Sequence, residues 1–294
     1  MPTIDATSTA SRPRPTVSVV IPALNEAATV GAVVAAIVDQ LHRDPTSRIV
    51  DEVVVVDGGS QDATALTAAA AGARVLQQGS MLGGAPVGRG KGDALWQGLA
   101  ATTGELVVFI DADIRGFDPA FVSGLIAPLV ADPAVLLTKA AYDRPLGTTG
   151  SSTGGGRVTE LLARPVLATF WPELGHLAQP LSGEYAGRRA LLASLPFVQG
   201  YGVEIALLID IAERYGADAI RQVDLGVRHH AHQPLDALGR MAAELLQVAL
   251  SRAARSGRDP VARPVLRQPS RATDGSITLT DHHVSWAERA PAAR

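Results

Sequence analysis

Two aspartates, Asp111 and Asp113, are the side chains whose type and spacing point most directly to chemistry. They follow an apolar run at residues 106–110 that has the composition of a buried strand. Two carboxylates at the carboxyl end of a strand can bind one divalent cation, and Mg²⁺ and Mn²⁺ prefer such oxygen ligands, often shared with substrate phosphates. The triplet fits a metal site, and taken alone it fits an ordinary turn as well.

Two more groups of polar residues follow the earlier strands predicted at residues 17–21 and 53–56. The first group is Pro22, Ala23, Leu24, Asn25 and Glu26, and the second is Asp57, Gly58, Gly59 and Ser60. If these residues are only structural, Asn25 is the N-cap of the helix that follows the first strand, and Asp57 is part of a tight turn. A functional interpretation makes both groups contacts for a nucleoside, because Gly58 lets the backbone approach a ligand closely.

The elements that must position these residues alternate between strands and helices. This alternation predicts an α/β fold with a parallel sheet and right-handed crossovers. Further helices are predicted at residues 26–41, 62–71 and 91–102, and a short strand at 74–76. Ligands of such sheets bind outside the carboxyl ends of the strands. That rule places five polar residues on one edge of the sheet: Asn25, Glu26, Asp57, Asp111 and Asp113. Turn residues without a common function would meet there only by coincidence.

The second half of the chain has a less regular pattern. Helices are predicted at residues 119–130, 158–169, 203–215 and 234–254, and strands at 134–141, 183–187 and 219–224. From residue 256 the chain is rich in Arg and Pro with little periodicity, so we expect a flexible, solvated tail or a subunit contact there. Residues 1–15 lack the apolar core of a signal peptide and are expected to form a disordered tail.

Two basic residues open predicted helices next to glycines and could bind anions. The ammonium of Lys91, together with helix N–H groups, suits a phosphate, although an exposed lysine is usually only solvated. Gly156, Arg157 and Thr159 combine N–H groups, a guanidinium and a hydroxyl into a cradle for a phosphate or a carboxylate. The alternative for this second group is a flexible linker whose arginine faces water.

Four later residues complete the set of candidates. Arg228, His230 and His232 follow the strand predicted at residues 219–224. A neutral imidazole at His230 could complete the metal site begun by the aspartates, and His232 shares its face if the segment is extended. Glu204 opens a predicted helix, where it either balances the helix dipole or places a carboxylate beside a reacting sugar.

Composition excludes several classes of protein. The 294 residues are 47% hydrophobic and 19% charged, and the net charge is −3, which argues against a dedicated nucleic-acid binder. The absence of cysteine excludes disulfides and thiolate metal sites. No apolar stretch approaches the roughly 20 residues that span a bilayer. We therefore expect a cytoplasmic protein that binds neither nucleic acid nor a membrane.

The order of these motifs resembles the nucleotide-sugar glycosyltransferases of the GT-A fold. The chain is most similar to one family, the glucosyl-3-phosphoglycerate synthases of actinobacteria, a retaining family numbered 81. The resemblance runs from about residue 16 to 255 and is carried by residues 19–26, 90–92, 109–113, 156–160, 180–184, 200–204 and 224–228. The segment at 156–159 and the late Arg and His residues are specific to that family, whereas the first motifs are shared with many family-2 enzymes.

On the donor side, the resemblance implies a site for UDP-glucose. The residues implied to hold the uridine are Ala23, Leu24, Asn25 and Glu26, and Pro22 and Gly58 are included among the residues that bind the nucleotide sugar. Asp113 and His230 would bind Mg²⁺ or Mn²⁺, with Asp111 beside the ribose or the sugar. Lys91 would contact the nucleotide, Arg228 the diphosphate and Glu204 the sugar. Gly58 replaces a serine of the family, so a base contact there would involve the backbone alone.

On the acceptor side, the resemblance implies that Gly156, Arg157 and Thr159 hold 3-phosphoglycerate, with His232 at a position where we expect asparagine. It also implies a nucleotide-sugar half at residues 16–140, an acceptor half at 141–255, and a homodimer. The implied reaction transfers glucose with retention to give glucosyl-3-phosphoglycerate and UDP. The alternatives are a mannosyl-3-phosphoglycerate synthase that uses GDP-mannose, a polyprenyl-phosphate glycosyltransferase, and a nucleotide-sugar-binding regulator without turnover.

Overall fold

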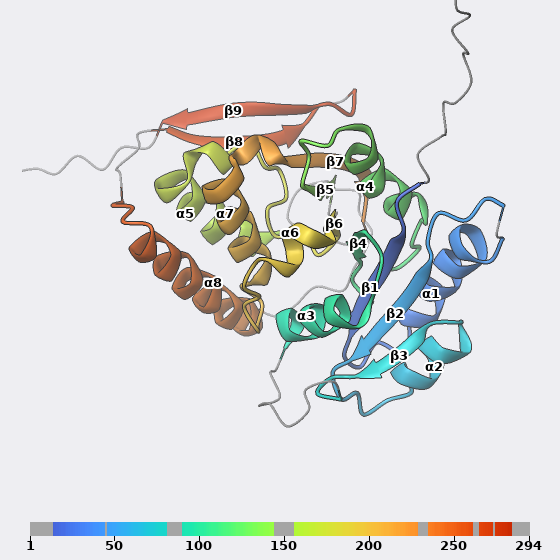
Figure 1. Cartoon of the computed structure of the whole chain (residues 1–294). Helices are drawn as coiled ribbons and strands as arrows, with labels where there is room; N and C mark the ends of the chain where they lie inside the picture. The colour runs from blue at the N-terminus through green and yellow to red at the C-terminus, as the bar shows by residue number, and fades with distance from the viewer. Residues whose placement is uncertain are drawn as a thin grey trace, which may run out of the picture.

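A computed structural model describes residues 14–44, 46–80, 90–143, 156–228, 235–260, 265–272 and 274–283. Its centre is a seven-stranded sheet in the order β3-β2-β1-β4-β6-β5-β7 (Figure 1). The strands are β1 (Val17–Ala23), β2 (Glu52–Asp57), β3 (Arg74–Gln77), β4 (Leu106–Phe109), β5 (Leu137–Asp143), β6 (Tyr185–Arg188) and β7 (Ile220–Val227). The predicted α/β fold is confirmed, and each of the predicted strands is present.

Helices connect the strands. They are α1 (Val30–Ile37), α2 (Thr64–Ala70), α3 (Lys91–Ala101), α4 (Ala120–Ala131), α5 (Arg164–Phe170), α6 (Arg189–Ala193), α7 (Val203–Tyr215) and α8 (Leu235–Arg255). π-Helical turns extend α1 over Val38–His42 and precede α5 over Thr159–Ala163, and short 3₁₀ turns occupy Pro172–Leu174 and Ala217–Ala219. None of the helices in the described ranges is long and apolar enough to cross a bilayer.

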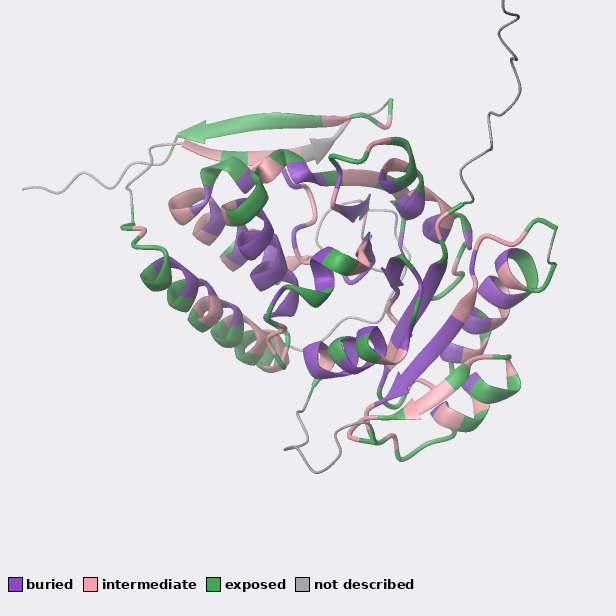
Figure 2. Cartoon of the chain, viewed as in Figure 1, coloured by how far each residue is buried: buried purple, intermediate pink, exposed green. Residues whose placement is uncertain are grey.

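Alternating strand residues build one hydrophobic core on each face of the sheet. Val19 and Ile21 of β1 belong to the core that includes α1, α2 and α4, whereas Val20 belongs to the core that includes α3, α5, α7 and α8. Successive side chains of a strand point to opposite faces, so a strand covered on both faces is apolar throughout. Figure 2 shows the central strands largely buried, whereas exposed residues lie on outer helix faces, in loops and along β9 (Ile277–His283).

The prediction of a wholly parallel sheet is wrong for β6, which runs antiparallel to both β4 and β5. The pairs β1–β2, β1–β4, β2–β3 and β5–β7 are parallel, as predicted. The chain returns into the sheet at the edge where β4 ends, because Tyr185, the first residue of β6, pairs with Phe109, the last of β4. The residues just before β6 therefore join the carboxyl edge of the sheet.

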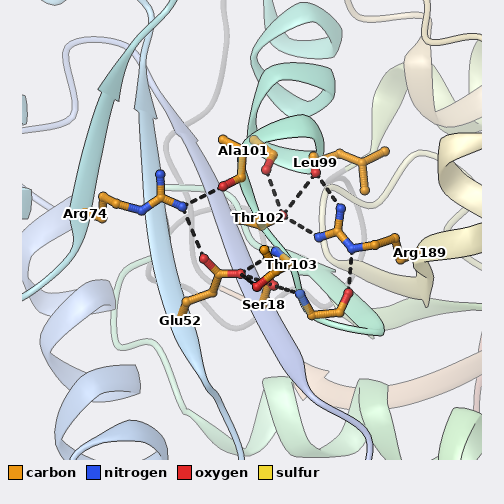
Figure 3. A network of polar contacts seen from close by, with 10 residues as sticks. Ser18, Glu52, Arg74, Leu99, Ala101, Thr102, Thr103 and Arg189 are labelled. Carbon is orange, nitrogen blue, oxygen red and sulfur yellow. Dashed lines mark hydrogen bonds and ion pairs between the residues drawn. The ribbon is translucent and has the colours of Figure 1, made fainter. Parts of the chain in front are cut away.

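A polar network fixes the carboxyl end of α3 (Figure 3). Arg189 donates to the carbonyl of Leu99 at 2.6 Å, and Arg74 donates to the carbonyl of Ala101 at 2.8 Å. Arg74 also pairs with Glu52 of β2 at 3.1 Å. The last carbonyls of a helix have no partner within it, so these donors tie α3 to the sheet at the end opposite its first residue.

The prediction of a flexible tail from residue 256 is wrong for residues 265–271 and 277–283, which are strands. β8 (Val265–Arg271) and β9 (Ile277–His283) form an antiparallel hairpin. Arg267 and Asp281 pair across it at 2.8 Å, and Gln268 donates to Glu160 at 2.9 Å. All of β9 beyond Ile277 is exposed, and only its first four residues, 277–280, alternate between apolar and polar types, which is a short signal for a strand.

Candidate active site

Six charged residues converge at the carboxyl edge of the sheet. They are Lys91 at the start of α3, Asp111 and Asp113 after β4, Glu184 before β6, Glu204 in the first turn of α7, and Arg228 after β7. Parallel strands direct the connections that follow them to one edge, which explains why segments so distant in sequence meet there. Five of the six were candidates from the sequence; Glu184 was not.

Lys91 links two of the carboxylates. Its Nζ lies 2.7 Å from Asp111 Oδ1 and 2.8 Å from Glu204 Oε1. Burial disfavours the ammonium, but these two carboxylates more than offset it, and the pKa of Lys91 lies well above its usual value. Of the two interpretations of Glu204, balance of the helix dipole does not account for its environment by itself, because its carboxylate also forms an ion pair with Lys91.

Arg228 contacts three carboxylates, one of which, Asp111, it shares with Lys91. Its Nη2 lies 2.7 Å from Asp113 Oδ1, 3.1 Å from Asp111 Oδ2 and 3.2 Å from Glu184 Oε1. Tyr142 donates its hydroxyl to Glu184 Oε2 at 2.5 Å, and its ring lies 5.6 Å from the guanidinium carbon. Burial opposes the charge, but Glu184 and its neighbours raise the pKa of Arg228 well above its usual value. The guanidinium is thus a permanent, oriented positive charge.

Two buried residues of the site escaped the sequence analysis. Glu184 is fully buried beside Arg228, and Lys139 of β5, 1% exposed, donates to the carbonyl of Ser182 at 2.6 Å. Lys139 Nζ also lies 4.5 Å from the ring centroid of Tyr185. Burial lowers the pKa of Lys139 to about 8. The signal for both was a charged residue inside a predicted strand or beside it, which buried strands seldom tolerate without a partner.

The acidic residues at this edge suit a divalent cation. Burial and the neighbouring Asp111 raise the pKa of Asp113, and burial with Asp113 raises the pKa of Glu26. A divalent cation would relieve this crowding of negative charge. The described residues contain no group of three or more metal-binding side chains. Of the two predicted metal ligands, Asp113 lies at this edge and His230 lies outside the described residues, as does His232.

The predicted uridine segment is a rigid turn at the ends of β1 and β2. Asn25 has a φ of 56°, its N–H donates to Ser60 Oγ at 2.9 Å, and its Oδ1 accepts from the N–H of Gln61 at 2.8 Å. The N-cap interpretation of Asn25 is wrong, because α1 begins only at Val30. Asn25 instead clamps two neighbouring turns together.

Gly58 lies in the same corner as Ala23 and Leu24. A Cβ at position 58 would lie 3.5 Å from the carbonyl oxygen of Ala23 and 3.6 Å from Leu24 Cβ. The N–H of Gly58 donates to that carbonyl at 2.8 Å, so a base contact by this backbone would have to use its C=O. Leu24 is 56% exposed, which leaves its apolar surface available to a planar ring, and Pro22 precedes this corner on β1.

The start of α3 differs from the prediction. The N–H groups of Gly92 and Asp93 donate to the carbonyls of Gly200 and Gln199, at 3.3 and 3.0 Å, so they do not face an anion. A Cβ at Gly92 would lie 1.7 Å from the carbonyl oxygen of Val198, which leaves room only for glycine. The segment before α7 therefore holds the start of α3 in place, and only the Lys91 side chain is available as a cationic contact.

The predicted acceptor cradle opens the helical segment before α5. Gly156 has a φ of 76°, and its carbonyl accepts from the N–H of Glu160 at 3.0 Å. Thr159 is buried, and Arg157 follows Gly156 directly. A Cβ at Gly156 would lie 3.8 Å from both Thr159 Oγ1 and Gln179 Oε1, so these three residues surround one point.

Comparison with known proteins agrees with this geometry. The Glycosyl transferase family 2 sequence model matches residues 18–154. Glucosyl-3-phosphoglycerate synthase of Mycobacterium tuberculosis is 52% identical over 242 residues, which are 81% of this chain and 73% of that protein. The chain belongs to the glucosyl-3-phosphoglycerate synthase family. The family member from Petrotoga mobilis is 46% identical over 272 residues, 91% of this chain and 78% of that protein.

Solved structures of glucosyl-3-phosphoglycerate synthase share the fold. The M. tuberculosis enzyme in complex with Mn²⁺, UDP-glucose and phosphoglyceric acid superposes with a TM-score of 0.75 at 46% identity, covering 94% of this chain and 90% of that chain. The same enzyme with Mg²⁺ and UDP gives a TM-score of 0.74 with the same coverage. The predicted GT-A fold and family resemblance are both confirmed.

Proposed function

We propose that this chain transfers glucose from UDP-glucose to 3-phosphoglycerate, with retention at the anomeric carbon, giving glucosyl-3-phosphoglycerate and UDP. The observation that carries the proposal is the buried network in which Lys91 and Arg228 bridge four carboxylates at the carboxyl edge of the sheet. Support comes from the M. tuberculosis family member, which shares the fold and has been crystallised with Mn²⁺, UDP-glucose and phosphoglyceric acid.

The two cations of the network serve the departure of UDP. Arg228 and Lys91 are held in fixed positions by their carboxylate partners, so they need no rearrangement to face developing negative charge. Preorganised positive groups of this kind stabilise a transition state more than they stabilise the ground state. A divalent cation bound at Asp113, with His230 as the second proposed ligand, would neutralise further charge on the leaving diphosphate.

Retention in this site does not proceed through a covalent intermediate. Retention by two displacements requires a carboxylate nucleophile beside the anomeric carbon. Asp111 and Glu204 both pair with Lys91, while Glu184 is fully buried between Arg228 and Tyr142. A carboxylate held by such partners is a weak nucleophile, which supports attack on the same face from which UDP leaves. A trapped glucosyl-enzyme would contradict this mechanism.

The acceptor would bind at the start of the helical segment before α5. Gly156, Arg157 and Thr159 would bind the phosphate and carboxylate of 3-phosphoglycerate at the start of a helix. An anchored acceptor beside the sugar converts the reaction into an effectively unimolecular one. We further propose a cytoplasmic homodimer, on the family resemblance alone, and light scattering of the purified protein tests the dimer.

The test is release of the nucleoside diphosphate from purified protein with Mg²⁺, 3-phosphoglycerate and either UDP-glucose or GDP-mannose. We expect release from UDP-glucose that requires both the metal and 3-phosphoglycerate, with EDTA and acceptor-free reactions as controls. Release from GDP-mannose alone would move the chain to mannosyl transfer. Nucleotide binding with no release from either donor would refute turnover.

A further inference from the structure

Gln179 lies beside Gly156 in the proposed acceptor cradle, and its side-chain oxygen has no hydrogen-bond partner among the described residues. Its Oε1 is buried, and its carboxamide makes no hydrogen bond to any residue that the structure describes. A buried polar atom without a hydrogen bond is costly, by roughly 1–3 kcal/mol, and most such atoms in folded proteins are paired. An orphaned oxygen at this place therefore indicates a ligand atom that completes it.

The position of Gln179 is fixed from both sides. The carbonyl of Ala178 accepts from Arg164 at 2.9 Å, and the N–H of Ala178 donates to Gln222 Oε1 at 2.5 Å. Beyond Gln179, the carbonyl of Ser182 accepts from Lys139 at 2.6 Å. The backbone that carries Gln179 is thus pinned, while its own side chain is left out of the internal bonding.

The same segment holds other polar atoms without partners. Ser182 Oγ and Tyr185 OH are also buried and make no hydrogen bond within the described residues. Both follow Gln179 along the stretch that returns to the carboxyl edge of the sheet. Polar atoms without described partners therefore recur in the segment that leads to the edge where ligands of such sheets bind.

The chemistry of the acceptor identifies the atom that Gln179 meets. A carboxamide oxygen only accepts hydrogen bonds, so its partner must be a donor. The phosphate and carboxylate of 3-phosphoglycerate are acceptors at neutral pH, and its hydroxyl is the one donor. Gln179 Oε1 and Thr159 Oγ1 both lie 3.8 Å from the point where a Cβ of Gly156 would stand. We infer that Gln179 accepts a hydrogen bond from the acceptor hydroxyl that attacks the sugar.

Gln179 would act as a binding and positioning residue and would take no proton. A hydroxyl that donates to Oε1 presents its oxygen lone pair away from the protein, toward the bound sugar. The inference rests on the proposed acceptor site at Gly156, Arg157 and Thr159. It adds the Gln179 carboxamide to that site as the group that distinguishes 3-phosphoglycerate from an analogue without the hydroxyl.

The experiment compares 3-phosphoglycerate with 3-(phosphonooxy)propanoate, which lacks only the hydroxyl. Affinities are measured by calorimetry on protein saturated with UDP and Mg²⁺, so no turnover occurs. The wild type should bind 3-phosphoglycerate roughly threefold to tenfold more tightly, the effect of one hydrogen bond. In Gln179→Met that preference should vanish, because the apolar side chain cannot accept from the hydroxyl. A preference retained in Gln179→Met overturns the inference, and Gln179→Leu repeats the test with a second apolar side chain.

Gln222 provides a matched control. Its Oε1 accepts from the N–H of Ala178 and its Nε2 donates to the carbonyl of His176 at 3.0 Å, so both ends of its carboxamide are used within the protein. Gln222→Met should lower the melting temperature and keep the preference for the hydroxyl. Gln179→Met breaks no described internal hydrogen bond and removes a buried oxygen that lacks one, so its melting temperature should equal or exceed that of the wild type. If Gln179 had a purely structural role, Gln179→Met would lower the melting temperature and keep the preference for the hydroxyl.

An Arg157→Ala arm separates failure of this inference from failure of the proposed acceptor site. If the site is correct, Arg157→Ala weakens both ligands equally and keeps the preference for the hydroxyl. If Arg157→Ala changes neither affinity, the proposed site is wrong. If Arg157→Ala weakens both ligands but Gln179→Met keeps the preference, the site stands and the role of Gln179 is refuted.

Discussion

Gly183 lies directly against the carboxylate of Asp111. A Cβ at position 183 would be 2.0 Å from Asp111 Oδ2 and 2.4 Å from Oδ1. Asp111 in turn contacts Lys91 at 2.7 Å and Arg228 at 3.1 Å. Because position 183 is a glycine, the segment before β6 can approach the site closely. This close approach leaves room for the Asp111 carboxylate in the position where it contacts both Lys91 and Arg228.

Gly183→Ala should therefore inactivate the protein while leaving it folded. The added methyl must displace Asp111, since carbon and oxygen cannot approach within 3 Å, and a displacement of about 1 Å in an active site can reduce activity about 100-fold. Steady-state rates with UDP-glucose and 3-phosphoglycerate measure the loss. Gly239→Ala is the matched control: a Cβ there meets nothing within 4 Å, so activity should stay and stability should rise slightly. Full activity in Gly183→Ala would show that the site tolerates this displacement.

A second prediction concerns the shape of Arg228. Arg228→Lys should reduce kcat/KM at least tenfold, because one ammonium on a shorter reach cannot replace a planar guanidinium that contacts Asp111, Asp113 and Glu184 together. The remaining crowding of carboxylates should also weaken the fold, measurable as a lower midpoint in urea. Arg240→Lys, in an exposed pair with Asp236 at 3.2 Å, should change neither quantity. Wild-type activity in Arg228→Lys would mean that charge alone suffices.

Local sequence identified the residues that lie beside recognisable strand ends. Asp111, Asp113 and Lys91 follow or precede apolar segments whose periodicity is plain, so their common edge followed from the topology of parallel strands. Glu184 could not be placed in this way. Its contribution depends on the direction of β6, and period-two patterning is the same for a strand run in either direction.

Contacts between distant segments carried no local signal. The N–H groups at the start of α3 looked available for an anion, but the carbonyls of Gln199 and Gly200 occupy them from more than 100 residues away. Gln179 was missed for a related reason: a glutamine in a loop is unremarkable until its neighbours leave it unpaired. The residue type of Asn25 suits an N-cap, and only the start of α1 at Val30 excludes that role.

A third prediction tests the proposed acceptor cradle by kinetics. Arg157→Ala should raise the KM for 3-phosphoglycerate about tenfold to 100-fold, since hydrogen bonds to charged groups contribute roughly 1.5–3 kcal/mol. UDP affinity, measured separately by calorimetry, should stay at the wild-type value. Arg221→Ala removes a comparable but exposed arginine, 3.8 Å from Asp132, and should leave both quantities unchanged. An unchanged KM for 3-phosphoglycerate in Arg157→Ala would refute the cradle.

The buried Lys139 predicts an unusual dependence of stability on pH. Its pKa in the folded protein is about 8, whereas an unfolded lysine keeps its ordinary value of 10.5. Between these values the unfolded chain binds a proton at this side chain that the folded chain has lost, so this group makes the free energy of unfolding increase with pH from about 8 toward 10.5. Below pH 8 both states are protonated and its contribution no longer changes.

Lys139→Met removes this titration and gives the measurement its reference. Urea unfolding of both proteins at pH 7, 8, 9 and 10 yields their difference in stability, in which the other titrating groups largely cancel. The free energy of unfolding of the wild type should increase relative to that of Lys139→Met as pH rises above about 8. A second variant, Lys91→Met, should show a smaller gain in that window. Asp111 and Glu204 keep the pKa of Lys91 itself above its ordinary value, so Lys91 acts here only through its share in lowering the pKa of Lys139. A constant difference between wild type and Lys139→Met across this range would mean that Lys139 stays charged in the folded state, stabilised by Glu204 and the ring of Tyr185 more strongly than burial opposes it.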